Sequence, residues 1–212
     1  MEKALQIIQE NVVNGNRDAV EAQVQQALDA GIKPEEILSL GLIAAMKEVG
    51  DRFEAGEFYV PEMLIAARAM QSGLALLKPF LIQSGVPSAG RVVIGTVKGD
   101  LHDIGKNLVA MMLEGAGFEI IDLGTDVSPE KFIEAVKDYN ANLVGMSALL
   151  TTTMTNMKLV LGALQEAGLR ERVKVMIGGA PVTEAYAKTI GADGYAPDAS
   201  RAVNLAKTLL RV

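Results

Sequence analysis

The sequence predicts an α + α/β protein, in which an N-terminal four-helix bundle is followed by a doubly wound, five-stranded parallel sheet. Two observations lead to this prediction. Apolar residues recur at intervals of three and four through residues 1–84, without any strand pattern. From residue 91 onward, short β-branched runs alternate with helix-forming segments. The change of pattern indicates two domains.

Four helices account for the first 84 residues. The spacing of Leu5, Ile8 and Val12 indicates the first helix, and the same spacing recurs in the second. The fourth is expected from near Pro61 to about residue 83. The expected helix ends are Gly15 and Gly31 as C-terminal caps, Asn16 as an N-cap and Pro34 as a first-turn residue.

A small, polar segment, QSGVPSAG, covers residues 83–90 and is typical of a linker. We therefore predict a helical domain over 1–84, a linker over 85–90 and an α/β domain over 91–212.

Five short runs in the second domain predict the strands. They are RVVIGTV, FEIIDLG, NLVGMSA, VKVMIGG and ADGYAP. In a parallel sheet the loops after the strands meet at one edge, where ligands bind. The residues expected at that edge are Asp100, His102 and Gly105 after the first strand, Ser147, Leu149 and Thr151 after the third, Gly178 and Gly179 after the fourth, and Tyr195 at the fifth.

The composition argues against several classes of partner and site. A net charge of −6 and only 4% aromatic residues disfavour nucleic acid and anionic membrane. The chain has no cysteine, which rules out disulfides, thiolate metal sites and iron–sulfur clusters held by this chain. Neither a signal peptide nor an apolar run of transmembrane length is present, so a cytoplasmic location is expected.

The segment GTVKGDLHDIGKN, residues 95–107, contains the only histidine, His102. One interpretation is a loop residue hydrogen-bonded near the start of a helix, with Asp103 or Asp100 as its N-cap. A zinc site would need more ligands than one histidine and scattered carboxylates provide. A macrocycle supplies its own equatorial nitrogens and needs one axial ligand, with Asp100 available to fix the imidazole tautomer.

Other chemistries fit less well. A triad of Ser147, His102 and Asp100 lacks the G-x-S-x-G turn that exposes a nucleophile. The glycines after the first strand do not have the spacing of a dinucleotide-binding loop. The glycine pair would allow a ligand tail to approach the backbone closely, and Ser147 and Thr151 would offer polar contacts.

Three elements together resemble a known family. D-L-H-D-I-G at 100–105 is similar to the D-x-H-x-x-G signature of cobalamin-binding domains, and S-A-L and G-G resemble its later elements. In this sequence 41 residues separate Gly105 from Ser147, and 28 separate Leu149 from Gly178, as in that family. The segment VGDRFEAGEFYVPEMLIAARAM is similar to the helical cap domain of methionine synthase and of small corrinoid proteins.

The resemblance implies a Rossmann-like (flavodoxin-like) α/β domain that holds a corrinoid without its own base. His102 would bind cobalt, and Asp100 and Thr153 would continue from it as the catalytic hydrogen-bonded chain. The cofactor-binding residues would be His102, Asp103, Gly105, Ser147, Leu149, Thr151, Gly178, Gly179 and Tyr195, with Phe53, Val60 and Met63 of the cap over the upper face of the ring. For these last three, the helical core is the alternative location.

The resemblance also implies a function. The bound cobalamin would accept a methyl group as Co(I) from a methyl-donor methyltransferase and pass it to a methyl-acceptor methyltransferase, whose acceptor would be tetrahydrofolate or a thiol coenzyme. A reductive activase would be a further partner, and the chain would be a subunit that is not active alone. The alternatives are a cobalamin-dependent sensor, a mutase subunit and a flavodoxin-like domain for another ligand.

Overall fold

The computed structural model describes residues 2–84 and 88–212. The chain divides into two compact units, the first made of Met1–Pro87 with Glu114–Gly117 and the second of Ser88–Leu113 with Phe118–Val212. We refer to them as the helical unit and the α/β unit. The predicted linker over 85–90 stays a prediction, because residues 85–87 lie outside the described residues.

The helical unit contains the four predicted helical stretches. Their elements are α1 (Glu2–Val13), α2 (Arg17–Asp29), α3 (Pro34–Glu36), η1 (Ile37–Ile43), α4 (Ala44–Glu54) and α5 (Val60–Ser84). The middle three follow one another without a break and form the third stretch. The seven-residue π-helix η1 within it was not predicted, because its winding leaves no distinct spacing in the sequence.

The helix ends agree with the sequence except at one residue. Gly15 and Gly31 adopt left-handed φ values of 70° and 76°, as C-terminal caps require. Asn16 occupies the N-cap position of α2, as expected, but its side chain makes no capping hydrogen bond. Its backbone (φ −82°, ψ 75°) lies outside the extended region of a capping residue, and its side chain donates to Asn11 Oδ1 instead (3.2 Å).

Close packing of α2 on α5 holds the helical unit together. Val20 and Val24 of α2 are fully buried, as the periodicity predicted. A Cβ at Gly73 of α5 would lie 2.8 Å from Val20 Cγ1, so the glycine is what lets the two helices approach.

The α/β unit is a five-stranded parallel sheet covered by helices on both faces. Its elements are β1 (Arg91–Thr96), α6 (Ile104–Gly115), β2 (Glu119–Asp122), α7 (Pro129–Asp138), β3 (Leu143–Ser147), α8 (Asn156–Glu166), β4 (Lys174–Gly178), α9 (Glu184–Ile190), β5 (Gly194–Tyr195) and α10 (Ala199–Leu210). The strand order is β2-β1-β3-β4-β5, which confirms the doubly wound prediction.

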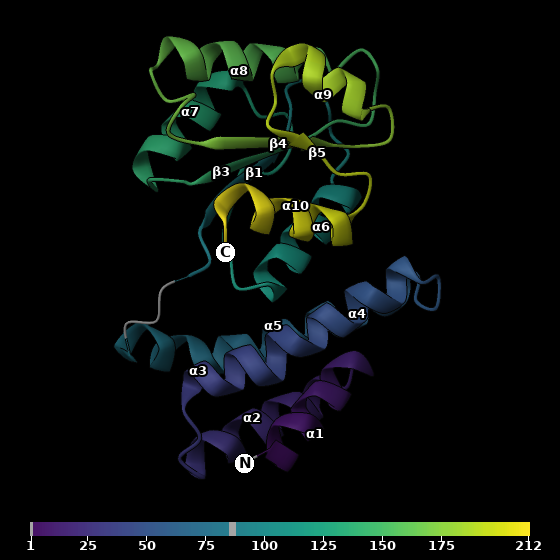
Figure 1. Ribbon diagram of the computed structural model, residues 1–212, viewed down its shortest axis with the longest axis vertical. Coiled ribbons are helices and arrows are strands. Elements are labelled where there is room, and N and C mark those ends of the chain that lie inside the picture. Colours follow the sequence, from purple (N-terminus) through teal and green to yellow (C-terminus); the bar gives the residue numbers. More distant parts are fainter. Residues whose placement is uncertain (1, 85–87) are drawn as a thin grey trace. The chain divides into compact units, whose positions relative to one another are not determined.

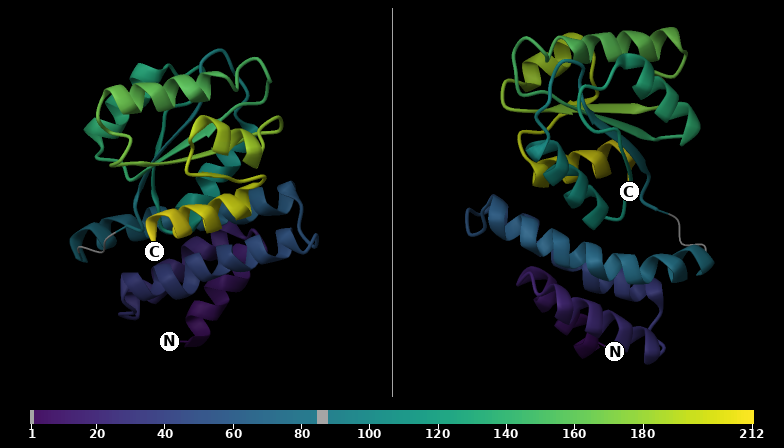
Figure 2. Two further views of the ribbon diagram at one scale, coloured as in Figure 1. Left: turned by 45° about the horizontal axis from the view of Figure 1, so that its top comes forward. Right: turned by 180° about the vertical axis from the view of Figure 1, so that it is seen from behind.

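The helices form two layers around this sheet. Helices α7, α8 and α9 cover one face, and α6 and α10 cover the other (Figure 1). Both views in Figure 2 show α8 and α10 on opposite sides of the sheet. The three central strands β1, β3 and β4 are largely buried and rich in valine, isoleucine and methionine because both of their faces are covered.

The strand register places the ends of three strands side by side. Thr96 of β1 pairs with Ser147 of β3, and Ser147 pairs with Gly178 of β4. The strand order reverses between β1 and β3, and ligands of such sheets bind outside the carboxyl ends at this point. The loops at 97–103 and 148–155 both start there. Among the helices of the described residues, none has the length and apolarity to cross a membrane.

The loops after β3 and β4 touch at Gly179. Its φ is 123°, and an added Cβ would lie 1.9 Å from the carbonyl oxygen of Ala148. A side chain at this position would therefore push the two loops apart.

We expect Gly179→Ala to destabilise the cofactor-free protein by more than the roughly 1–3 kcal/mol of backbone strain alone. The matched control is Gly162→Ala in α8, where an added Cβ meets no atom within 4 Å and φ is not left-handed. This control should gain about 0.5–1 kcal/mol. Urea unfolding of both variants measures the difference, and equal midpoints would contradict the assigned role of Gly179.

Candidate functional site

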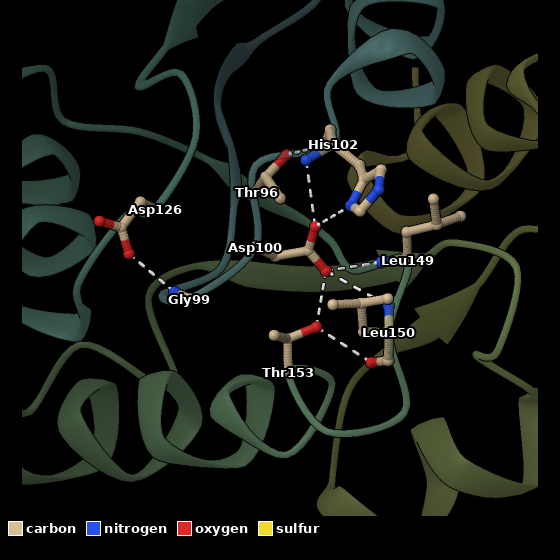
Figure 3. Close-up of polar contacts among 8 residues, drawn as sticks. All are labelled: Thr96, Gly99, Asp100, His102, Asp126, Leu149, Leu150 and Thr153. Atoms are coloured by element: carbon tan, nitrogen blue, oxygen red, sulfur yellow. Dashed lines mark hydrogen bonds and ion pairs between the residues drawn. The ribbon is translucent and has the colours of Figure 1, made fainter.

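The imidazole of His102 is held on one side and exposed on the other. Its Nδ1 lies 2.8 Å from Oδ1 of Asp100, and its backbone N–H donates to the same oxygen at 3.1 Å. About half of the side chain, 52%, is exposed. Figure 3 shows the second ring nitrogen, Nε2, on the side of the ring away from Asp100.

The carboxylate of Asp100 is fully buried between two loops. Its second oxygen, Oδ2, accepts hydrogen bonds from Thr153 Oγ1 (2.6 Å) and from the backbone N–H groups of Leu149 (2.8 Å) and Leu150 (3.3 Å). With the two bonds from His102, five donors surround one carboxylate (Figure 3).

These donors keep Asp100 ionised. Burial by itself would raise the pKa of this carboxyl group, since it disfavours the charged form. The hydrogen bonds from Thr153, Leu149 and His102 outweigh burial and hold the pKa of Asp100 far below its ordinary range. Asp100 is therefore a hydrogen-bond acceptor only.

An ionised Asp100 determines the tautomer of His102. Because a carboxylate cannot donate, Nδ1 must carry the proton in the 2.8 Å bond between them. Nε2 of the neutral ring then keeps its lone pair, and it lies on the exposed side. This is the form in which an imidazole binds a metal.

The side chains around His102 fit a large flat ring. Four apolar residues are exposed here, although leucine and isoleucine are usually buried: Leu101 (73%), Leu149 (44%) and Leu150 (43%) in the two loops, and Ile104 (76%) at the start of α6. Gly105 adds open space, because a Cβ there would meet no atom within 4 Å. In the described residues no three His, Asp or Glu side chains gather as a metal site. A single axial donor beside an apolar surface therefore suits a metal that brings its own macrocycle.

The other residues predicted for the cofactor lie in different environments. Asp103 directly precedes α6, and its side chain accepts from Asn107 Nδ2 (3.1 Å). Thr151 is exposed in the loop after β3. Ser147, Gly178 and Tyr195 end their strands and are partly buried.

The three predicted cap residues differ in exposure within the helical unit. Met63 is fully buried, Phe53 is partly buried and Val60 is 39% exposed. Their contact with a ring stays a prediction.

Sequence analysis missed the residues that fix the backbone of the site. Thr96 Oγ1 donates to the carbonyl of His102 (2.9 Å), and Asn156 Nδ2 donates to the carbonyl of Lys98 (2.7 Å). Asp126 accepts from the N–H of Gly99 (2.7 Å) and donates its own N–H to the carbonyl of Asp100 (3.0 Å). No spacing in the sequence identifies these contacts, although Thr96 ends β1 and Asn156 begins α8; Asp126 lies in the loop between β2 and α7.

Two family models match the chain. One, described as a B12 binding domain, matches residues 90–204, which is more than half of the chain. A second with the same description matches residues 4–78. The chain therefore belongs to the B12-binding family, and its cofactor is cobalamin or a related corrinoid.

Two similar proteins indicate a narrower group within the B12-binding family. The chain is 47% identical to a dimethylamine corrinoid protein of Methanosarcina barkeri, over 99% of this chain and 98% of that protein. It is 44% identical to a trimethylamine corrinoid protein of the same organism, over 96% and 94%.

Solved structures agree with this grouping. A cobalamin-binding protein from Desulfitobacterium hafniense matches with a TM-score of 0.80 and 31% identity, over 97% of this chain and 98% of that one. A chain of the methanol:cobalamin methyltransferase complex MtaBC from Methanosarcina barkeri matches with a TM-score of 0.88 and 29% identity, over 99% and 80%. These matches confirm the predicted fold class, cofactor class and family.

Replacing Gly105 by alanine tests whether its open space receives the cofactor. In the cofactor-free protein the variant should be as stable as wild type or up to about 1 kcal/mol more stable, because alanine favours a helix. Corrinoid affinity should fall about tenfold or more, because the new methyl group occupies space that the ring needs. Titration with cobalamin measures the affinity. Gly162→Ala is the control, and an unchanged affinity for Gly105→Ala would exclude close approach of the cofactor there.

The lowered pKa of Asp100 predicts how stability depends on pH. A carboxyl group whose pKa is lower in the folded protein than in the unfolded chain, where it is about 3.9, stabilises the fold fully above that value. This contribution is lost as the pH falls through the folded value. Urea unfolding of wild type and Asp100→Asn should therefore differ by about 1–3 kcal/mol at pH 6, and by less as the pH drops below about 4. A difference that grows toward acid pH would contradict the assignment.

Proposed function

We propose that this protein is a methyl carrier that binds its corrinoid without the cofactor's own base, with Nε2 of His102 as the lower axial ligand of cobalt. One observation carries the proposal: at the switch point of the sheet, a buried, ionised carboxylate holds the half-exposed imidazole of His102 through Nδ1, which leaves the lone pair of Nε2 free on the other side of the ring. The apolar surface around it supports a ring at the same place.

When bound, the corrinoid supplies a cobalt ion that accepts and releases a methyl group. Asp100 orients the imidazole and keeps the proton on Nδ1, so that Nε2 stays available as a donor. Thr153 holds Asp100 in place through a 2.6 Å bond to its other oxygen. Leu101 and Ile104 would exclude water from the face of the bound ring that lies toward His102.

We propose that the methyl group comes from a methylamine, with dimethylamine as the first candidate. The support is the identity to dimethylamine and trimethylamine corrinoid proteins over nearly the whole chain. Corrinoid proteins work with methyltransferases, and the proposed partners are a methyl-donor methyltransferase, a methyl-acceptor methyltransferase and a reductive activase. The acceptor would be tetrahydrofolate or a thiol coenzyme, and we place the system in the cytoplasm.

The helical unit would act as a lid over the upper face of the ring. Phe53, Val60 and Met63 are the residues proposed to cover it. A lid protects a reactive cobalt, and it must open for each methyl transfer.

The test uses the protein loaded with cobalamin and reduced, together with a dimethylamine-specific methyltransferase. Methylation of the bound cobalamin, followed by its absorption spectrum, should be at least tenfold faster with dimethylamine than when a methanol-specific enzyme and methanol are supplied. A sensor or regulator would bind the corrinoid and show no transfer above the rate of free cobalamin.

His102→Ala is the matched variant for the axial ligand. We expect it to bind cobalamin 10–100-fold more weakly, as is typical when a metal-site contact is lost. A variant with the same spectrum and affinity as wild type would exclude His102 as the ligand.

A further inference from the structure

Lys106, in the first turn of α6, buries its ammonium group. Its side chain is 2% exposed. The ammonium has three protons and three acceptors within reach: both carboxylate oxygens of Asp122 (2.5 and 2.6 Å) and Oδ1 of Asn107 (2.7 Å). A buried charge is costly unless it is paired and fully hydrogen-bonded, and here every donor has an acceptor.

This arrangement indicates whether the lysine contacts a ligand or has a structural role. Because its three protons are all engaged within the protein, none is left for a ligand, and the paired ammonium cannot act as a base. Lys106 therefore does not touch a bound molecule. It connects α6 to the end of β2, where Asp122 is the last residue.

From this ion pair, two chains of hydrogen bonds lead to the 102–103 segment. One reaches the side chain of Asp103, and the other reaches the backbone carbonyl of His102. The shorter one runs through Asn107, whose Nδ2 donates to Oδ2 of Asp103 (3.1 Å), the residue after the histidine. The other starts at Asp122, which accepts from the N–H of Gly124 (2.9 Å).

The second chain continues through the loop after β2. The carbonyl of Gly124 accepts the N–H of Thr96 (3.0 Å), and Thr96 Oγ1 donates to the carbonyl of His102 (2.9 Å). Figure 3 shows this last bond on the backbone of His102, apart from the contacts of Asp100 with the imidazole. Asp100 holds the ring and the backbone N–H of His102, while this network holds its backbone carbonyl.

We propose that Lys106 is a positioning residue for the axial ligand: its ion pair with Asp122 fixes the backbone at 102–105 so that Nε2 of His102 stands ready before the cofactor arrives. The inference rests on the proposed function of His102. An axial ligand must be held within about 0.5 Å of its productive position, which a single side-chain contact does not ensure.

A double-mutant cycle between Lys106 and His102 tests this role, with the affinity for cobalamin as the readout. Lys106→Met keeps the length of the side chain, and the remaining Asp122 is 39% exposed and can be hydrated. We expect cobalamin affinity to fall about tenfold when His102 is present and less than twofold in the His102→Ala background. A merely structural role would cause the same loss in both backgrounds, and that result would overturn the proposal, as would no loss in either.

Two further variants make the result decisive. Lys188→Met removes an exposed lysine–glutamate pair of α9 and should leave the affinity unchanged. Asn107→Ala removes the bond from Lys106 and the bond to Asp103 but leaves the ion pair of Lys106 with Asp122 in place. It is used if Lys106→Met does not fold, as judged by circular dichroism. It should show the same dependence on His102, and equal losses in both backgrounds would overturn the proposal. If His102→Ala binds as tightly as wild type, the proposed function itself fails, and this inference falls with it.

Discussion

The carboxylate of Asp100 is buried among five hydrogen-bond donors, and none of them is lysine or arginine. An ion removed from water without a full counter-charge is stable only where donors replace its hydration. Two of the five come from His102 and three from the loop after β3, so the loops after β1 and β3 must meet at this group. The contact between these two loops therefore determines where the imidazole of His102 lies.

The strand order of the sheet makes this contact between the two loops possible. Because β1 and β3 are neighbours, residues that are about fifty positions apart in the chain come within 3 Å of each other. Small residues then hold the neighbouring loops in register, as Gly179 does against Ala148. Asp126 and Asn156 attach the β1 loop to the segments on either side of it. The result is a firm edge at which four apolar side chains and the imidazole of His102 are exposed.

Sequence reasoning predicted those parts of the site that depend on local spacing. Asp100 and His102 are two residues apart, so their contact could be expected from the loop alone, whereas Thr153 was expected only through the family resemblance. The backbone donors of Leu149 and Leu150 and the bonds of Thr96 and Asp126 depend on tertiary contacts between loops. A pattern of side chains does not record such contacts.

Sequence reasoning did not identify a role for Lys106, although the sequence contains a signal for one. Lys106 lies seven residues before the buried Leu113, on the same face of an apolar helix, where a lysine needs a partner. The sequence therefore indicates that Lys106 needs a partner, but it does not identify Asp122, which lies at the end of β2. The glycine pair was interpreted as room for a ligand tail, with a turn at the end of the strand as the alternative, and the contact of Gly179 with Ala148 supports a structural role.

The three contacts from the β3 loop to Asp100 include two main-chain N–H groups, which every residue except proline provides. The side chains of Leu149 and Leu150 are therefore uncoupled from the anchoring of the carboxylate, although they belong to the same loop. Positions 149 and 150 could be varied in a library to accept corrinoids with altered ring peripheries, while the metal-binding imidazole stays where it is.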